Sequence, residues 1–247
     1  MATDKAYKVL AKQEGISNSK AKELIDKGLV RAMGKKVMIA RGEIPTDTTF
    51  TVKEVASIKL IFQDDDILAL DKPAFMTSDE VARKYPKYMM LNRLDKETSG
   101  VMMLAKNEDF RKRAIKEFKN NNVYKEYVAV VDGKIVEEVI IDLPISTIKG
   151  KTARSRIDEK HGRPAKTTVI PYMIEGNKSK VKIVIENGRT HQIRVHLQYA
   201  GMPIIGDLQY GKPSNQVQRV MLHSKITKIF DYEFEAREPK EFFHFGF

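Results

Sequence analysis

Apolar and polar side chains follow two different periods along the chain. In residues 1–50, apolar positions recur three or four residues apart, which predicts two short helices around Val9 and Ile25. After them, residues 29–32 and 36–39 flank a Met-Gly-Lys sequence, a pattern typical of a hairpin. The first fifty residues are therefore expected to fold as helix, helix and hairpin.

Beyond a linker expected at residues 42–47, short apolar or alternating runs indicate strands separated by turn residues. Two helices are predicted among them, one capped by Asn107 and one capped by Thr190 with Leu197 on its buried side. Strands outnumber helices and do not alternate regularly with them, so residues 55–247 are assigned to the α+β class with a mixed, largely antiparallel sheet. The predicted strands lie at 58–62, 67–73, 101–105, 123–131, 180–186, 225–230 and 232–236.

The overall composition is that of a globular protein. Of 247 residues, 42% are hydrophobic and 31% are charged, which excludes collagen-like and wholly disordered chains and allows a small domain beside an ordinary one. No run approaches the roughly 20 apolar residues that cross a bilayer, and the start lacks the pattern of a signal peptide, so we expect no membrane insertion and a cytoplasmic location. The absence of Cys removes disulfides, thiolate metal ligands and cysteine nucleophiles.

The chain is basic. Lys and Arg total 44 against 33 Asp and Glu, which gives a formal charge of +11. Because a cation that neutralises a phosphate releases condensed counterions, this excess favours nucleic acid or another polyanion as a partner. A solvated basic surface would have the same composition, so motifs have to decide between the two.

Two polar segments carry candidate chemistry. Residues 92–100 form a loop that presents Asp95 before an apolar strand. Further along, a turn enters a helix on which His191, Arg194 and Gln198 share one face. Taken alone, each segment could be an ordinary capped turn or a solvated helix. The two histidines of this helix are five residues apart, which does not place them together as ligands, so no metal site is expected.

Three motifs in order carry a resemblance to a known family. The chain reads NRLDKETSG from Asn92, KEYVAVVDG from Lys125 and GRTHQIRVHLQYAGMPIIGDLQYG from Gly188. These are similar to HRLDxxTSG, KxYxAxVxG and GRTHQIRVH in the RluA family of RNA pseudouridine synthases, and shorter echoes read LDKPA, GRPAKT and LHS. The resemblance covers about residues 58–245 and implies the pseudouridine synthase fold and an isomerase that converts uridine in RNA to its carbon-linked isomer.

The resemblance also implies roles around the reacting base. It implies that Asp95 is the catalytic carboxylate, that Arg194 pairs with it and that Tyr127 packs against the target base. It also implies that Arg93 enters the base stack when the uridine is extruded. An ionised Asp can act as a nucleophile without a general base, and the fork of an Arg keeps it charged and aimed. The remaining residues expected to contact the substrate are Asn92, Arg189, His191, Gln192 and Ile193.

The first module has a resemblance of its own. Its segment SNSKAKELIDKGLVRAMGKKV is similar to the RNA-binding domain first known from ribosomal small-subunit protein four, which implies that residues 1–50 position RNA. An appended domain of this kind resembles the family's enzymes for large-subunit ribosomal RNA. We therefore expect a role in rRNA processing, with transfer RNA as the alternative substrate. The resemblance implies neither cofactor nor metal, and we expect a monomer.

Two functions from other classes compete with this one. A noncatalytic RNA-binding or ribosome-assembly factor would keep the fold without needing Asp95, Tyr127 and Arg194. A retaining glycosidase would need a second carboxylate about 5 to 5.5 Å from Asp95, and Glu97 is the nearest candidate.

The chain departs from the family at three places. Asn92 stands where the family usually has His, Phe75 replaces the usual Gly after the LDKPA echo, and residues 76–90 lack a VHP-like continuation. These departures concern the approach to the loop and leave the implied chemistry in place.

Overall fold

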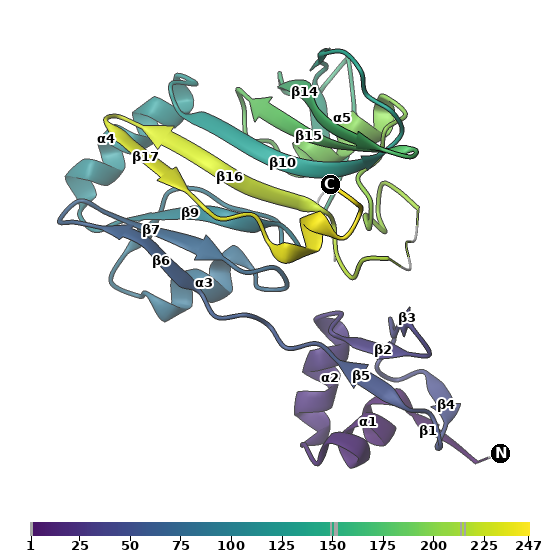
Figure 1. The fold of residues 1–247 in the computed structure, drawn as a ribbon. Coiled ribbons are helices and arrows are strands. Elements are labelled where there is room, and N and C mark those ends of the chain that lie inside the picture. Colours follow the sequence, from purple (N-terminus) through teal and green to yellow (C-terminus); the bar gives the residue numbers. More distant parts are fainter. Residues whose placement is uncertain (1, 149, 151–152, 213, 215) are drawn as a thin grey trace. The chain divides into compact units, whose positions relative to one another are not determined.

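Figure 1 shows the computed structural model, which describes residues 2–148, 150, 153–212, 214 and 216–247. The chain divides into two units, Met1–Ala56 and Ser57–Phe247, and each is treated by itself. Within these described ranges, no helix is both long enough and apolar enough to cross a membrane.

The first unit begins with the two predicted helices. Gly15 ends the first in the left-handed conformation at φ 64°, and Ser17 caps the second by accepting a hydrogen bond from the Lys20 backbone N–H at 3.2 Å. The apolar sides of both helices pack against Phe50 in a small core. The elements of this unit are β1 (Thr3–Lys5), α1 (Ala6–Glu14), α2 (Asn18–Asp26), β2 (Val30–Ala32), β3 (Lys35–Lys36), β4 (Glu43–Pro45) and β5 (Phe50–Val52).

The predicted hairpin is present as β2 and β3, although its second strand ends at Lys36 and not at residue 39. Both turn residues have positive φ, 46° at Met33 and 75° at Gly34, which matches the twist of a two-residue hairpin. The predicted linker at residues 42–47 is wrong. Because β4 pairs with β1, this polar segment belongs to the first unit, and the division falls at residue 56.

The second unit is built on a ten-stranded sheet with the order β11-β14-β15-β10-β16-β9-β7-β6, in which β17 also pairs with β16 and β8 with β9 (Figure 1). Every described pairing in this sheet is antiparallel except that of β16 with β9. The predicted mixed, largely antiparallel α+β fold is therefore confirmed. The strands are β6 (Lys59–Gln63), β7 (Ile67–Lys72), β8 (Met89–Met90), β9 (Ser99–Ala105), β10 (Tyr124–Asp132), β11 (Val139–Asp142), β14 (Lys166–Glu175), β15 (Lys178–Ile185), β16 (Leu222–Ile229) and β17 (Tyr232–Glu235).

All seven strands predicted for this unit are present, but β8, β11, β12, β13 and the long β14 were not predicted. The pairing of β14 with β15 shifts register between Pro171 and Met173, and a proline in the run hides the strand pattern. The remaining elements are β12 (Ile145–Ile148), which pairs with β13 (Arg154–Ile157), the helices α3 (Ser78–Lys84), α4 (Glu108–Lys119) and α5 (Gln192–Tyr199), and the 3-10 helix η1 (Lys240–Phe243).

The predicted cap of α4 is confirmed, whereas the predicted cap of α5 is wrong. Asn107 caps α4 as predicted, by accepting from the Phe110 N–H at 2.8 Å. Thr190 does not cap α5. His191 is the capping residue in a left-handed conformation, and the Gln192 side chain accepts from the Arg189 N–H at 3.0 Å in place of the expected threonine bond. This turn connects β15 with α5.

The core of the second unit fixes the place of α5. Ile193 and Leu197 are buried, as predicted, among side chains of β10 and β15 such as Val130 and Ile183. Burial of each such side chain contributes about 1.5–3 kcal/mol, which ties the helix firmly to the sheet. Polar residues at the start of α5 are therefore held at a constant position over the strands.

Candidate active site

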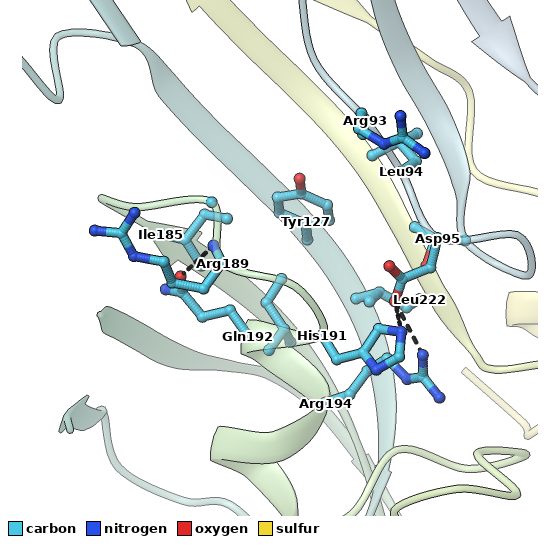
Figure 2. Close-up of a pocket in the computed structure, with 13 residues that line it drawn as sticks. Arg93, Leu94, Asp95, Tyr127, Ile185, Arg189, His191, Gln192, Arg194 and Leu222 are labelled. Atoms are coloured by element: carbon cyan, nitrogen blue, oxygen red, sulfur yellow. Dashed lines mark hydrogen bonds and ion pairs between the residues drawn. The ribbon is translucent and has the colours of Figure 1, made fainter. Parts of the chain in front are cut away.

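The structure brings Asp95 and Arg194 into contact. Asp95 lies in the loop before β9 and Arg194 lies in the first turn of α5, 99 residues later. Nη1 of Arg194 donates to Oδ2 of Asp95 at 3.0 Å (Figure 2). The two segments that the sequence singled out thus form one site.

Arg194 is aligned by a second carboxylate. Its Nε and Nη2 donate to Oδ2 and Oδ1 of Asp207 at 2.7 and 2.9 Å, and its guanidinium lies 5.0 Å from the ring centre of Tyr210. Burial disfavours the charge, but the bonds to Asp207 outweigh it and raise the pKa of Arg194. Sequence reasoning missed Asp207 and Tyr210, although both lie in the quoted GMPIIGDLQYG stretch.

His191 faces the same oxygen of Asp95, with Nε2 3.8 Å from Oδ2. Its Nδ1 is 2.9 Å from the Tyr210 hydroxyl, which accepts from the Ser155 N–H at 2.7 Å. Burial lowers the pKa of His191, while the Asp95 charge acts in the opposite direction. Figure 2 shows both contacts on one carboxylate oxygen of Asp95, with the other directed into the pocket.

Tyr127 lies across the pocket from Asp95, on β10 (Figure 2). Its side chain is buried, and burial raises the pKa of Tyr127 to about 12. The hydroxyl therefore stays protonated at neutral pH, and the ring offers an apolar face with a polar tip.

The pocket around these groups is open to solvent, and its empty space of about 430 Å³ includes part of that solvent. Among the described residues that line it, Asp95 is the only carboxylate. Glu97, which a glycosidase mechanism would need as the second carboxylate, accepts instead from the Val220 N–H at 3.1 Å. The other lining residues are Arg93, Leu94, Thr98, Tyr127, Ile185, Gly188, Arg189, His191, Gln192, Ile193, Arg194 and Leu222.

Two of the predicted contact residues, Asn92 and Gln192, make hydrogen bonds within the protein, and one residue of the predicted polar face of α5 lies outside the pocket. Asn92 does not line this pocket, because its amide bonds to the Val101 carbonyl at 3.3 Å and to the Met103 N–H at 2.7 Å. The Gln192 amide is buried and bonds to backbone and to the Thr167 hydroxyl, so it braces the turn. Gln198 is exposed and lies outside the pocket lining, so the predicted polar face of α5 splits after Arg194.

Arg93 lies at the exposed mouth of the pocket, where its guanidinium makes two 3.0 Å bonds to Asp79. Side chains of this pair are 64% and 59% exposed, and a surface pair of this kind contributes only about 0–1 kcal/mol. Arg93 can therefore leave Asp79 at small cost.

A buried lysine that sequence reasoning did not single out supports the loop. Lys72, in the LDKPA echo, is fully buried and donates to the backbone carbonyls of Pro73, Met76 and Lys96. Burial lowers the pKa of Lys72 to about 7. Since Lys96 follows Asp95 directly, the 3.4 Å bond to the Lys96 carbonyl ties the backbone of the Asp95 loop to β7.

Phe75, the departure beside this lysine, adopts a left-handed φ of 67° with its ring buried. A left-handed conformation costs a non-glycine residue about 1–2 kcal/mol, which burial of an aromatic ring offsets. The chain therefore keeps at this position a backbone shape that glycine adopts easily.

Within the part of the chain that the structure describes, no three His, Cys, Asp or Glu side chains gather as metal ligands. The three consecutive acids at residues 64–66 form a turn in which Asp64 accepts from two backbone N–H groups at 2.9 Å.

The sequence and the fold were compared with those of known proteins. A family model described as RNA pseudouridylate synthase matches residues 59–199. The chain belongs to this family. An RNA pseudouridine synthase of Helicobacter pylori strain J99, itself described as uncharacterized, is 48% identical over 240 residues, which cover 97% of this chain and 99% of that protein. Membership makes the chain an RNA pseudouridine synthase, an isomerase.

Other relatives of the synthase differ in the RNA that their names state. The mitochondrial tRNA pseudouridine(32) synthase of Saccharomyces cerevisiae is 38% identical over 170 residues, covering 62% of this chain and 37% of that protein. The ribosomal large subunit pseudouridine synthase D of Vibrio vulnificus is 26% identical over 206 residues, covering 76% and 63%. The solved structure of human RNA pseudouridylate synthase domain containing 1 has a TM-score of 0.63 and 28% identity, covering 74% and 83%.

Proposed function

We propose that this synthase isomerises uridine in large-subunit ribosomal RNA, with Asp95 as its nucleophile. The observation that carries the assignment is the Asp95–Arg194 contact in a pocket whose described lining contains one carboxylate. Arg194 and His191 meet Oδ2, which leaves Oδ1 directed at the substrate space. A carboxylate held by a charged fork stays ionised and aimed, as a nucleophile requires.

The reaction rearranges the target without gain or loss of atoms. The bond from N1 of uracil to C1′ of the ribose breaks, the base turns, and C5 bonds to C1′. C5 then loses its proton and N1 gains one. In this proposal Asp95 forms and later releases a covalent bond to the substrate, while Arg194 offsets the change of charge on its carboxylate.

In this proposal, Tyr127 binds the extruded base and Arg93 takes its place in the base stack. The buried ring of Tyr127 packs against the extruded uracil, and its protonated hydroxyl offers a hydrogen bond. Arg93 leaves Asp79 and fills the space that the uridine vacates. Extruding a base costs a few kcal/mol, which contacts to the flanking phosphates offset.

Tritium release from RNA labelled at C5 of uracil tests the catalytic assignment. We expect wild-type protein to release tritium and Asp95→Asn to release none, with the same thermal unfolding midpoint within a few degrees. Asp231→Asn, an exposed acid outside the pocket, serves as the matched control. Equal release by Asp95→Asn and wild type would refute the assignment and favour a noncatalytic binding role for this residue.

The choice of RNA rests on the first unit. Residues 1–56 form a unit of two helices and short sheets whose sequence resembles a ribosomal RNA-binding domain, and we propose that it docks the enzyme on ribosomal RNA. The likeness to a mitochondrial tRNA synthase supports transfer RNA as the alternative. Mapping pseudouridines in both RNA classes, from cells with and without the gene, decides between them: a site lost only from transfer RNA would overturn the ribosomal proposal.

A further inference from the structure

A second hollow opens beside the Asp95 pocket in the same unit, and its empty space of about 1280 Å³ includes open solvent. We call it the flanking groove. Residues shared by the two linings are Arg93, Tyr127, Ile185, Gly188 and Arg189. A chain whose target nucleotide occupies the pocket therefore passes directly into the groove.

The flanking groove is lined by cations without acids. Arg93, Lys119, Lys125, Arg163 and Arg189 contribute to its surface, and none of the described lining residues is Asp or Glu. The acid next to it in the chain, Glu186, has its carboxylate paired with Lys166 at 2.8 Å. Positive charges gathered in this way repel one another, so an anion that enters the groove relieves the repulsion.

Two of these cations are anchored before any ligand binds. Lys125 is 8% exposed and donates from Nζ to the Glu186 backbone carbonyl at 2.7 Å, and Arg189 donates from Nε to the Pro164 carbonyl at 3.0 Å. Burial and then the Arg189 charge lower the pKa of Lys125 to about 8, while Glu186 opposes them. Burial and the Arg163 charge lower the pKa of Arg189. Fixed donors of this kind suit a phosphate.

The groove also has an apolar wall. Leu91, Ile115 and Phe118 are half-buried and line it beside the cations. An aromatic ring of this kind stacks on a base, which contributes about 1–3 kcal/mol per base. The side-chain amide of Asn187 donates to that of Asn121 at 3.2 Å, and both residues also line the groove.

We propose that the flanking groove binds the nucleotide adjoining the target uridine, with its phosphate on Lys125, Arg163 and Arg189 and its base on Phe118. The inference rests on the proposed function, because it takes the Asp95 pocket to hold the target. A base reaches Phe118 only when it is unpaired. The preferred substrate is therefore a uridine in a loop or single strand, and not one inside an uninterrupted duplex.

The phosphate site is tested by measuring how a fluorescein-labelled oligouridylate of nine nucleotides binds, with fluorescence anisotropy as the signal. The salt concentration is varied from 50 to 300 mM, a range that includes the roughly physiological 150 mM. Arg163→Gln in the full chain should weaken binding several-fold and reduce the slope of log K against log salt by about 0.7, the value for one phosphate of a single strand. Arg237→Gln is the matched control, since Arg237 is exposed and lies outside both linings. Equal slopes for the two variants would overturn the phosphate site.

Photo-crosslinking tests the base contact without relying on a variant that has to fold. Oligouridylate containing 4-thiouridine should crosslink to the α4 peptide that carries Phe118, and crosslinks confined to other peptides would overturn the proposal. Loss of binding in Arg163→Gln, together with a wild-type protein that releases no tritium, would retain the groove and defeat the catalytic assignment. If the wild-type protein releases tritium but Arg163→Gln binds RNA as Arg237→Gln does, the catalytic assignment holds and the groove proposal is refuted.

Discussion

Asp207 accepts two hydrogen bonds from Arg194, at 2.7 Å from Nε and at 2.9 Å from Nη2. The two side chains are 1% and 9% exposed. Because this fork occupies one edge of the guanidinium, Nη1 is left to meet Asp95 at 3.0 Å. The orientation of the group that contacts the proposed nucleophile is therefore set by a carboxylate outside the pocket lining.

Asp207→Asn should weaken both the fold and the reaction. The neutral amide keeps one acceptor for Arg194 and loses the charge, and breaking a buried ion pair costs about 3–5 kcal/mol. We expect kcat to fall about 100-fold, equivalent to ~2.7 kcal/mol in the barrier, along with a lower unfolding midpoint. Tritium release and thermal unfolding measure the two effects. A variant with wild-type kcat would show that Arg194 needs no second carboxylate.

Arg93 and Asp79 should respond unequally to mutation. If Arg93 fills the vacated stack, Arg93→Ala removes a substrate contact and should lower kcat/KM at least about tenfold, or ~1.4 kcal/mol. Asp79→Asn only frees Arg93 from a surface pair, so kcat/KM should change less than about threefold. Steady-state kinetics on labelled RNA compare them. Equal losses in both variants would mean that the pair itself, and not the free arginine, matters.

Gly100 and Gly133 allow a matched test of how closely the backbone packs where the Asp95 loop enters β9. Both have positive φ, 113° and 114°. A Cβ at Gly100 would collide with the Ser224 backbone of the adjacent strand β16, whereas one at Gly133 would meet no atom within 4 Å. Gly133→Ala should cost about 1–2 kcal/mol of unfolding free energy, and Gly100→Ala clearly more. Denaturant titrations of both variants check this; similar costs would contradict the collision.

His223 should make stability depend on pH. The Ala236 carbonyl can only accept, so Nε2 carries the proton at 3.1 Å, and Nδ1 accepts from the Ser99 hydroxyl at 2.9 Å. Burial lowers the pKa of His223 to about 4, below its usual value of 6.5. Between these values the unfolded chain binds the extra proton, so the free energy of unfolding falls as pH drops from 6.5 to 4.

The size of this effect has an upper limit of about 1.4 kcal/mol per pH unit for one proton. Urea titrations from pH 7 to pH 4 should therefore bring the wild type and His223→Gln closer in stability as the pH falls, because Gln does not titrate. Parallel curves over that range would mean that the pKa of His223 is the same in the folded and the unfolded chain.

Local structure was largely predictable because it depends on neighbours in the chain. The helix around Val9, the cap at Asn107 and the turn at Gly34 follow from apolar spacing, side-chain acceptors and positive φ, none of which needs a distant partner. The antiparallel α+β class follows from the order of strands. The pairing of Asp95 with Arg194 was available only from motifs shared with a family, since no local rule relates two positions 99 residues apart.

Only the tertiary structure showed what holds these groups. The fork from Asp207, the Lys96 carbonyl on Lys72 and the attachment of β4 to β1 are contacts between segments that the sheet and the core bring together. A sequence pattern reports the period of one segment and the polarity of its faces. The register and packing of the elements decide which carboxylate pairs with which guanidinium. Both are fixed only in the folded chain.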